Sequence, residues 1–179
     1  MRSLLVAIVA LATGAADASE TGRPAPTSAY TPLSGSSCHV HKTAESDESV
    51  QDCPGVDGYR LEVVDSDSRM TVTILTPDGK AFPLRFWDVV TRHFSSLGER
   101  AEWRLRRDDG RERPVALIVR VRASEDPESN RQVEYLAVAR VEADSACVIA
   151  RIAAAADANR RARDAADAAV SAKCLTDLP

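Results

Sequence analysis

The sequence predicts an α+β fold: an antiparallel sheet of six to seven strands with a C-terminal helix, fastened by two disulfides. Between Tyr59 and Ile152, apolar and polar residues alternate in several separate runs, which is the pattern of half-buried strands. An alanine-rich stretch with helical spacing follows at residues 157–169, and the chain after residue 18 has an even number of cysteines. A small closed β-barrel is the alternative that this strand pattern leaves open.

Residues 1–18 have the features of a secretory signal peptide. Arg2 precedes an apolar run from Leu4 to Ala12, and the segment ends in Ala16-Asp17-Ala18, a small-residue cleavage site. The apolar run is too short to cross a bilayer as a helix, and we expect no membrane span. The short, arginine-containing start is typical of bacterial export, so we expect a periplasmic or secreted protein.

The remaining chain divides into two parts. Residues 19–37 are rich in Ser, Thr, Pro and Gly, which predicts a flexible N-terminal segment. Residues 38–179 are expected to form a single β-rich domain with a C-terminal helix, because a chain of about 160 residues is long enough for one core.

Four cysteines remain after the predicted cleavage site: Cys38, Cys53, Cys147 and Cys174. In an exported protein an even number of cysteines indicates disulfides, and four allow three connectivities. Their positions favour Cys38–Cys53 and Cys147–Cys174, one pair at each end of the domain. The paired, tight Cys/His spacing of a zinc site is absent from the sequence, and we expect no metal site.

The first half of the domain is predicted to contain three strands. Residues 59–65 and 69–75 alternate in polarity and are joined by the turn-forming residues 65–68. Thr76-Pro77-Asp78-Gly79 fits a type I turn, and a third strand follows through residues 82–86. Residues 87–97 have apolar side chains at helical spacing but also adjacent valines, so a short helix and a loop both remain open.

The stretch from Ala101 to Ala123 predicts the central β-hairpin. A three-residue loop, residues 108–110, pairs Trp103 with Val115 and puts every large apolar side chain except Ile118 on one face. A two-residue turn pairs Trp103 with Ala116 instead and places arginines among the valines. We therefore expect the three-residue loop, with the second strand of the hairpin in the middle of the sheet.

Two more strands and a helix complete the predicted domain. Residues 132–143 are expected to pair beside the hairpin, and residues 147–152 form the last strand. Asp157 is a candidate N-cap for the helix. Because alanine buries little area, this helix is weakly driven onto the sheet, and a disulfide from Cys174 would hold it there. Its apolar stripe consists of Ala158, Ala162, Ala165, Ala166 and Ala169.

Several short motifs run through the domain. They are Tyr30-Thr31-Pro32-Leu33, Cys38, Cys53-Pro54-Gly55 followed by Gly58-Tyr59, the stretch from Phe94 to Gly98, Glu102-Trp103-Arg104, the stretch from Ala116 to Arg120, Ala146-Cys147-Val148, and Asn159 with Ala162-Arg163. In this combination the chain resembles a family of small exported proteobacterial proteins with a Cys-Pro-Gly-x-x-Gly-Tyr motif and two cysteine pairs. The resemblance covers nearly all of the chain after the signal. It implies export and a β-rich fold, and it implies no activity and no catalytic residue.

The charge pattern favours a non-enzymatic binding or envelope-associated module. A net charge of -4 argues against a nucleic-acid partner. The hairpin carries a basic face formed by Arg104, Arg106, Arg120 and Arg122, which point away from the valines. Guanidinium groups bind phosphates and carboxylates in a fork geometry, so the expected partner is an anionic envelope component or an exported protein. The alternative is a solvated face paired with glutamates.

Two other functions stay open in the sequence. A hydrolase would use His93 with Ser95 or Ser96, and Asp88 lies nearby, but the sequence has no G-x-S-x-G elbow. A purely structural envelope protein needs no ligand at all. His39 and His41 lie near Glu45 and Asp47 in a polar loop. Both imidazoles could bind one metal ion, but a lone His-x-His in a polar loop is usually solvated. We expect no cofactor and no catalytic residue.

Overall fold

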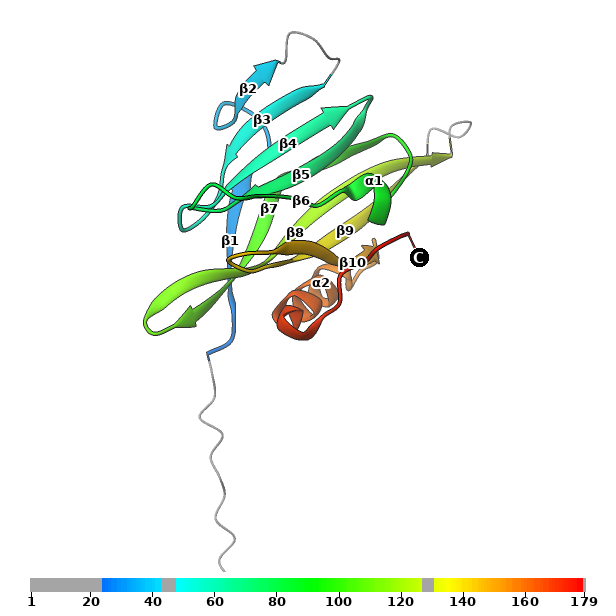
Figure 1. Cartoon of the computed structure of the whole chain (residues 1–179). Coiled ribbons are helices and arrows are strands. Elements are labelled where there is room, and N and C mark those ends of the chain that lie inside the picture. The colour runs from blue at the N-terminus through cyan, green and yellow to red at the C-terminus, as the bar shows by residue number, and fades with distance from the viewer. Residues whose placement is uncertain (1–23, 43–47, 127–130, 179) are drawn as a thin grey trace, which may run out of the picture.

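The computed structural model describes residues 24–42, 48–126 and 131–178 (Figure 1). The predicted signal peptide and the first residues of the predicted flexible segment lie outside this part. In chain order the elements are β1 (Thr27–Pro32), β2 (His39–Lys42), β3 (Ser49–Pro54), β4 (Arg60–Ser66), β5 (Arg69–Leu75), β6 (Ala81–Pro83), α1 (Phe86–Val89), β7 (Ser95–Asp108), β8 (Arg111–Asp126), β9 (Arg131–Val141), β10 (Ala146–Ala153), α2 (Ala158–Asp167) and the 3-10 helix η1 (Ala169–Ser171).

The described strands belong to one sheet with the order β10-β9-β8-β7-β5-β4-β3-β2, in which β1 also pairs with β7 and β6 with β5. Neighbouring strands are antiparallel except β5 and β7, which meet in parallel at Arg69 and Ser95. The sheet has ten strands rather than six to seven, and it is mixed rather than purely antiparallel. It is not closed, so the alternative of a small closed β-barrel was wrong.

The additional strands are β1, β2 and β3, which the sequence analysis read as a flexible segment and a polar loop. β1 pairs with β7 from Thr27 opposite Leu105 to Pro32 opposite Arg100. Leu33, just after β1, is buried in the core. These strands consist largely of polar residues and are held in the sheet by main-chain hydrogen bonds. They therefore lack the alternation of apolar and polar residues by which a strand is predicted from sequence.

The hairpin of β7 and β8 turns on two residues, not three. Asp108 lies opposite Arg111, and both turn residues have positive φ, 48° at Asp109 and 78° at Gly110, as the tight turns of β-hairpins require. The extra residue lies in the strand instead. Leu105 pairs with Pro114 and Arg104 with Ala116, so Val115 is left as a β-bulge.

This bulge restores the face assignment that the sequence predicted. The predicted partner of Trp103 was wrong, because Trp103 lies opposite Leu117 rather than Val115, and Ala101 lies opposite Val119. Their side chains enter one core together with the inner face of β4 and β5, because the sheet coils round so that its two halves share it (Figure 1). The fully buried members include Trp103, Leu117, Val119, Val121, Leu61, Val63, Val72 and Ile74.

The helix α2 covers the outer face of β8 to β10. The apolar side chains there, Ile118, Leu136 and Val138, pack against the alanine stripe of the helix. Both predicted disulfides are present, Cys38–Cys53 and Cys147–Cys174, and the second ties the chain after α2 to β10. Asp157 precedes the helix, but its side chain makes no capping hydrogen bond.

The stretch from 87 to 97 is neither one helix nor one loop. Helix occupies only α1, and β7 already begins at Ser95. Gly98 is therefore a residue of β7. A Cβ there would lie 3.0 Å from the Cβ of Arg120, so glycine permits this close approach of β7 and β8.

The turn geometry predicts that two substitutions of Asp109 differ in their effect on the free energy of unfolding. Proline fixes φ near -65°, so Asp109→Pro is incompatible with the left-handed conformation of this residue and should lower the free energy of unfolding by about 2 kcal/mol. Asp109→Asn should change it little, because asparagine suits this position. Urea denaturation of both variants beside wild type measures the difference. Equal losses would contradict the two-residue turn.

Candidate functional site

The four arginines of the predicted basic face divide into two pairs, and three of them, all except Arg122, contact the helix α2. Arg104 and Arg106 both donate to Asp167, the last residue of α2. Arg120 and Arg122 both bind Glu134 of β9, and Arg120 also reaches Asn159 near the start of α2. The structure therefore does not bring the four together as one open surface.

Arg104 is buried and fully engaged. Its Nε donates to Asp167 Oδ1 at 2.7 Å, and its Nη2 donates to Oδ2 at 2.8 Å and to the carbonyl oxygen of Pro26 at 2.9 Å. Its Nη1 donates to the hydroxyl of Ser28. This bidentate pair joins β7, α2 and the chain around β1. Arg104 is a structural residue, and it is not available to a ligand.

Glu102 forms a second connection between the sheet and α2. Arg163 donates to its two carboxylate oxygens at 2.7 and 3.3 Å, and the Ser28 hydroxyl donates at 2.6 Å. Burial is the largest single influence on this carboxyl and opposes its ionisation, but the hydrogen bonds from Arg163 and Ser28 outweigh it and hold the pKa of Glu102 below its usual value. Arg163 also donates to the hydroxyl of Tyr30 at 3.0 Å.

The second arginine pair faces a groove of about 410 Å³ beside α2. Glu134 accepts from Arg120 at 2.7 Å and from Arg122 at 3.0 Å. Burial works against ionisation of Glu134, yet these two guanidinium groups together lower its pKa. The groove is lined by Tyr30, Gly98, Glu99, Arg100, Glu102, Ile118, Arg120, Arg122, Leu136 and Asn159.

Arg100 is the third cation of this groove. Its guanidinium lies over the ring of Tyr30, 5.7 Å from the ring centroid. Within the described part of the chain, Arg100 has no carboxylate within ion-pair distance. Arg120 and Arg122 share the carboxylate of Glu134, and Arg100 stacks on the ring of Tyr30. These contacts use only some of the N–H donors of the three guanidinium groups, so N–H donors remain for a ligand in the groove.

Of the residues that line this groove, only Arg120 and Arg122 were predicted as site residues. Those that were not predicted include Tyr30, Arg100 and Asn159. Tyr30 belongs to a segment that was predicted to be flexible. Arg100 precedes the predicted hairpin. Asn159 and Arg163 lie one turn apart on the helix and flank its alanine stripe, which was a usable signal, since that flank must border the sheet.

The hydrolase residues are not joined into a catalytic arrangement. The Asp88 carboxylate is bound by Arg85 at 2.6 Å, and His93 is exposed, with its backbone N–H donating to Thr91. Ser95 and Ser96 open β7. Among the described residues, no hydrogen bond links His93 to either serine or to Asp88.

Of the two histidines of β2, His41 pairs with an acid. Nε2 of His41 lies 3.3 Å from Oδ2 of Asp52, which Arg60 also contacts. Glu45 and Asp47 lie outside the described residues. In the part of the chain that the structure covers, no three His, Cys, Asp or Glu side chains come together as metal ligands.

Asp167→Asn should weaken the fold more than the matched change one turn earlier. It removes the acceptor charge of buried Arg104 and should lower the free energy of unfolding by about 2 kcal/mol, less than for a fully buried pair because a third of Asp167 stays exposed. Asp164→Asn only breaks an exposed pair with Arg160 and should cost less than about 0.5 kcal/mol. Equal denaturation midpoints for the two variants would contradict the role of Arg104.

Acid should destabilise wild type more than Glu102→Gln. The pKa of Glu102 is lower in the folded chain than its ordinary value of 4.5, so the unfolded chain takes up a proton first as the pH falls. The stability that this carboxylate contributes is present above about pH 4.5 and is lost as the pH falls through the folded pKa. Thermal melts from about pH 6 to pH 3 should therefore give a flatter curve for Glu102→Gln. Parallel curves would show that Glu102 titrates normally.

Comparisons with protein-family models, curated proteins and solved structures found no match to this chain. None of the helices in the described ranges is long and apolar enough to cross a membrane.

Proposed function

We propose that this chain is a non-enzymatic, exported binding module that holds phosphate or carboxylate groups of an anionic envelope component in the groove beside α2. The observation that carries the proposal is the convergence of Arg100, Arg120 and Arg122 on one groove of about 410 Å³. Guanidinium forks recognise planar or tetrahedral oxyanions by paired hydrogen bonds, which fits this ligand class.

The arginines are held in place before a ligand arrives. Glu134 and Asn159 orient Arg120, Glu134 and the carbonyl oxygen of Leu97 orient Arg122, and the ring of Tyr30 supports Arg100. A preorganised site loses less side-chain entropy when it binds. Glu134 takes up only part of the donor capacity of the two arginines that it joins, so further acceptors are favoured in the groove.

Export belongs to the same proposal. The predicted signal peptide and the two disulfides support a periplasmic or secreted location, because disulfides persist in oxidising compartments. Membership of the proteobacterial family that the motifs resemble remains a prediction. Within the described residues, no contact specifically favours the hydrolase or the purely structural alternative.

Titration calorimetry of the oxidised protein with pyrophosphate and with trigalacturonate tests the groove and separates phosphate from carboxylate recognition. Arg100→Ser should weaken binding of the preferred probe about tenfold by removing one charged fork, and Arg122→Lys should do the same by replacing the fork with a point charge. Arg160→Ser is the matched control, because Arg160 is exposed on α2 and does not line the groove.

Two results would overturn this function. One is that neither probe binds at millimolar concentration. The other is that Arg160→Ser weakens binding as much as Arg100→Ser does, which would mean that only the net charge matters. Raising the salt concentration should weaken genuine groove binding in wild type, since the contacts are between charges.

A further inference from the structure

A second, larger cavity opens at the end of the sheet where the β3–β4, β5–β6 and β9–β10 turns meet the start of β8. Its volume is about 610 Å³, compared with about 410 Å³ for the arginine groove. No residue lines both. The lining consists of Asp57, Tyr59, Thr76, Pro77, Asp78, Lys80, Arg111, Arg113, Pro114, Val115, Glu142 and Ala143.

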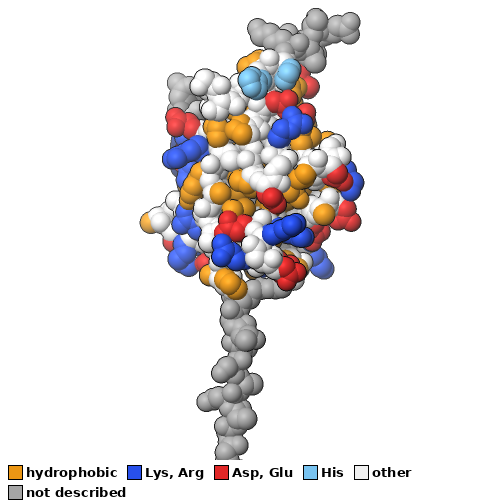
Figure 2. All heavy atoms as spheres, turned by 90° about the vertical axis from the view of Figure 1, so that its left-hand side faces the viewer, with side chains coloured by type: hydrophobic (Ala, Val, Ile, Leu, Met, Phe, Trp, Pro, Cys, Tyr) orange, Lys and Arg blue, Asp and Glu red, His pale blue; other side chains and the backbone are white. Residues whose placement is uncertain are grey.

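This cleft has an apolar floor that the bulge of β8 helps to form. Val115 is the residue left unpaired in the ladder, and Pro114 beside it has no N–H to donate. A bulge re-aims a side chain that a regular strand would place elsewhere. Tyr59 and Pro77 add apolar surface from the opposite half of the sheet. Figure 2 views the molecule from this side and shows hydrophobic side chains in the middle with charged ones around them.

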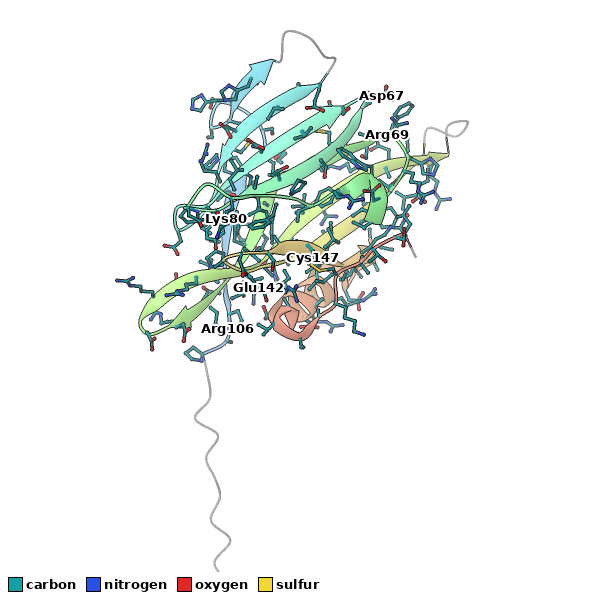
Figure 3. The ribbon with its side chains drawn as sticks, viewed as in Figure 1. Asp67, Arg69, Lys80, Arg106, Glu142 and Cys147 are labelled. Carbon is teal, nitrogen blue, oxygen red and sulfur yellow. A yellow bond between two sulfur atoms is a disulfide. The ribbon has the colours of Figure 1, made fainter. Side chains whose placement is uncertain are left out.

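Some of the charged side chains at the rim of the cleft have an ion-pair partner, and others do not. Lys80 pairs with Asp78 at 2.9 Å, and Glu142 is bound by Ser145 and lies 3.6 Å from Arg140. Lys80 and Glu142 come from turns at the same end of the sheet (Figure 3). By contrast, neither Arg111 nor Arg113 has an ion-pair partner in the described ranges.

Arg113 is also placed unfavourably in the absence of an anion. It lies directly opposite Arg106 in the ladder, and like charges in this position destabilise a sheet. Asp57 is the one acid of the lining without an ion pair among the described residues. The unpaired charges therefore sum to an excess of one positive charge over an apolar floor.

Tyr59 supplies a neutral hydrogen-bond donor. Burial raises the pKa of its phenol, and the nearby carboxylates of Asp57 and Asp78 raise it further. The hydroxyl therefore keeps its proton at neutral pH. The ring is fixed from behind by Trp103, with 6.0 Å between ring centroids.

We propose that this cleft is a second binding site, which takes an amphipathic organic anion with an unbranched or aromatic apolar body and one carboxylate. The body lies on Tyr59, Pro77 and Val115, and the carboxylate accepts from Arg111 and Arg113. The volume of this cleft lies in the range that is typical of small-molecule sites, although half of its lining residues are charged. The site is independent of the arginine groove and of the function proposed for it.

Decanoate is the probe for this cleft. Decan-1-ol is the control that keeps only the apolar chain, and acetate is the control that keeps only the carboxylate. By titration calorimetry, decanoate should bind with one molecule per chain and more tightly than either control. Arg111→Gln combined with Arg113→Gln should weaken decanoate binding about tenfold and leave decan-1-ol unchanged, because only the charged contacts are removed. Arg107→Gln is the matched control, since Arg107 belongs to the same hairpin, pairs with Glu112 and does not line the cleft.

A second measurement does not depend on any variant. Proton NMR of the wild-type complex should show nuclear Overhauser contacts between decanoate methylene groups and the Tyr59 ring. Arg100→Ser should leave these contacts and the affinity unchanged, which separates this site from the groove. Absence of decanoate binding, affinity unaffected by the double arginine variant, or contacts to other rings only would each overturn the proposal.

Discussion

The register of β7 against β8 is the constraint on which the other parts of the structure depend. One unpaired residue, Val115, shifts the ladder so that Trp103 enters the core and Arg104 points to the outer face. Side chains alternate along a strand, so a slip by one residue would exchange these faces and bury guanidinium groups among the valines. The bulge thus defines the core, the surface that α2 covers and the floor of the second cleft.

The helix turns a basic sheet face into two different surfaces. At its end, Asp167 neutralises Arg104 and leaves nothing for a ligand. Near its start α2 contributes Asn159, an uncharged residue, so Arg120 and Arg122 rely on Glu134 alone for a negative charge. The same residue type therefore stabilises the fold at one end of α2 and lines an open groove at the other. Because alanine gives the helix little apolar driving force, these polar contacts and the Cys147–Cys174 disulfide matter for its position.

Strong local patterns made much of this fold predictable. The strand at residues 69–75, both disulfides, the central place of β8 and the alanine face of α2 are confirmed by the structure. β1 to β3 were missed because these polar strands give no alternation signal. The turn between β7 and β8 was predicted with three residues instead of two. A bulge in the strand and a longer loop both put the same residues on one face, so the alternation pattern does not distinguish them. Of the candidate site, Arg120 and Arg122 were predictable from the sequence. That Arg104 binds Asp167 and is closed to a ligand was not predictable, because the two residues lie 63 positions apart in the sequence.

The central claim is that the outer-face arginines divide into a buried structural set and a ligand-accessible set. The most direct test follows the guanidinium Nε–H signals of 15N-labelled protein by NMR while pyrophosphate is added. We expect that Arg104 exchanges its Nε proton slowly with water and that its signal does not shift, whereas the signals of Arg100, Arg120 and Arg122 move together and saturate. A shift at Arg104 that matches the other three, or no shift at any of them, would contradict the claim.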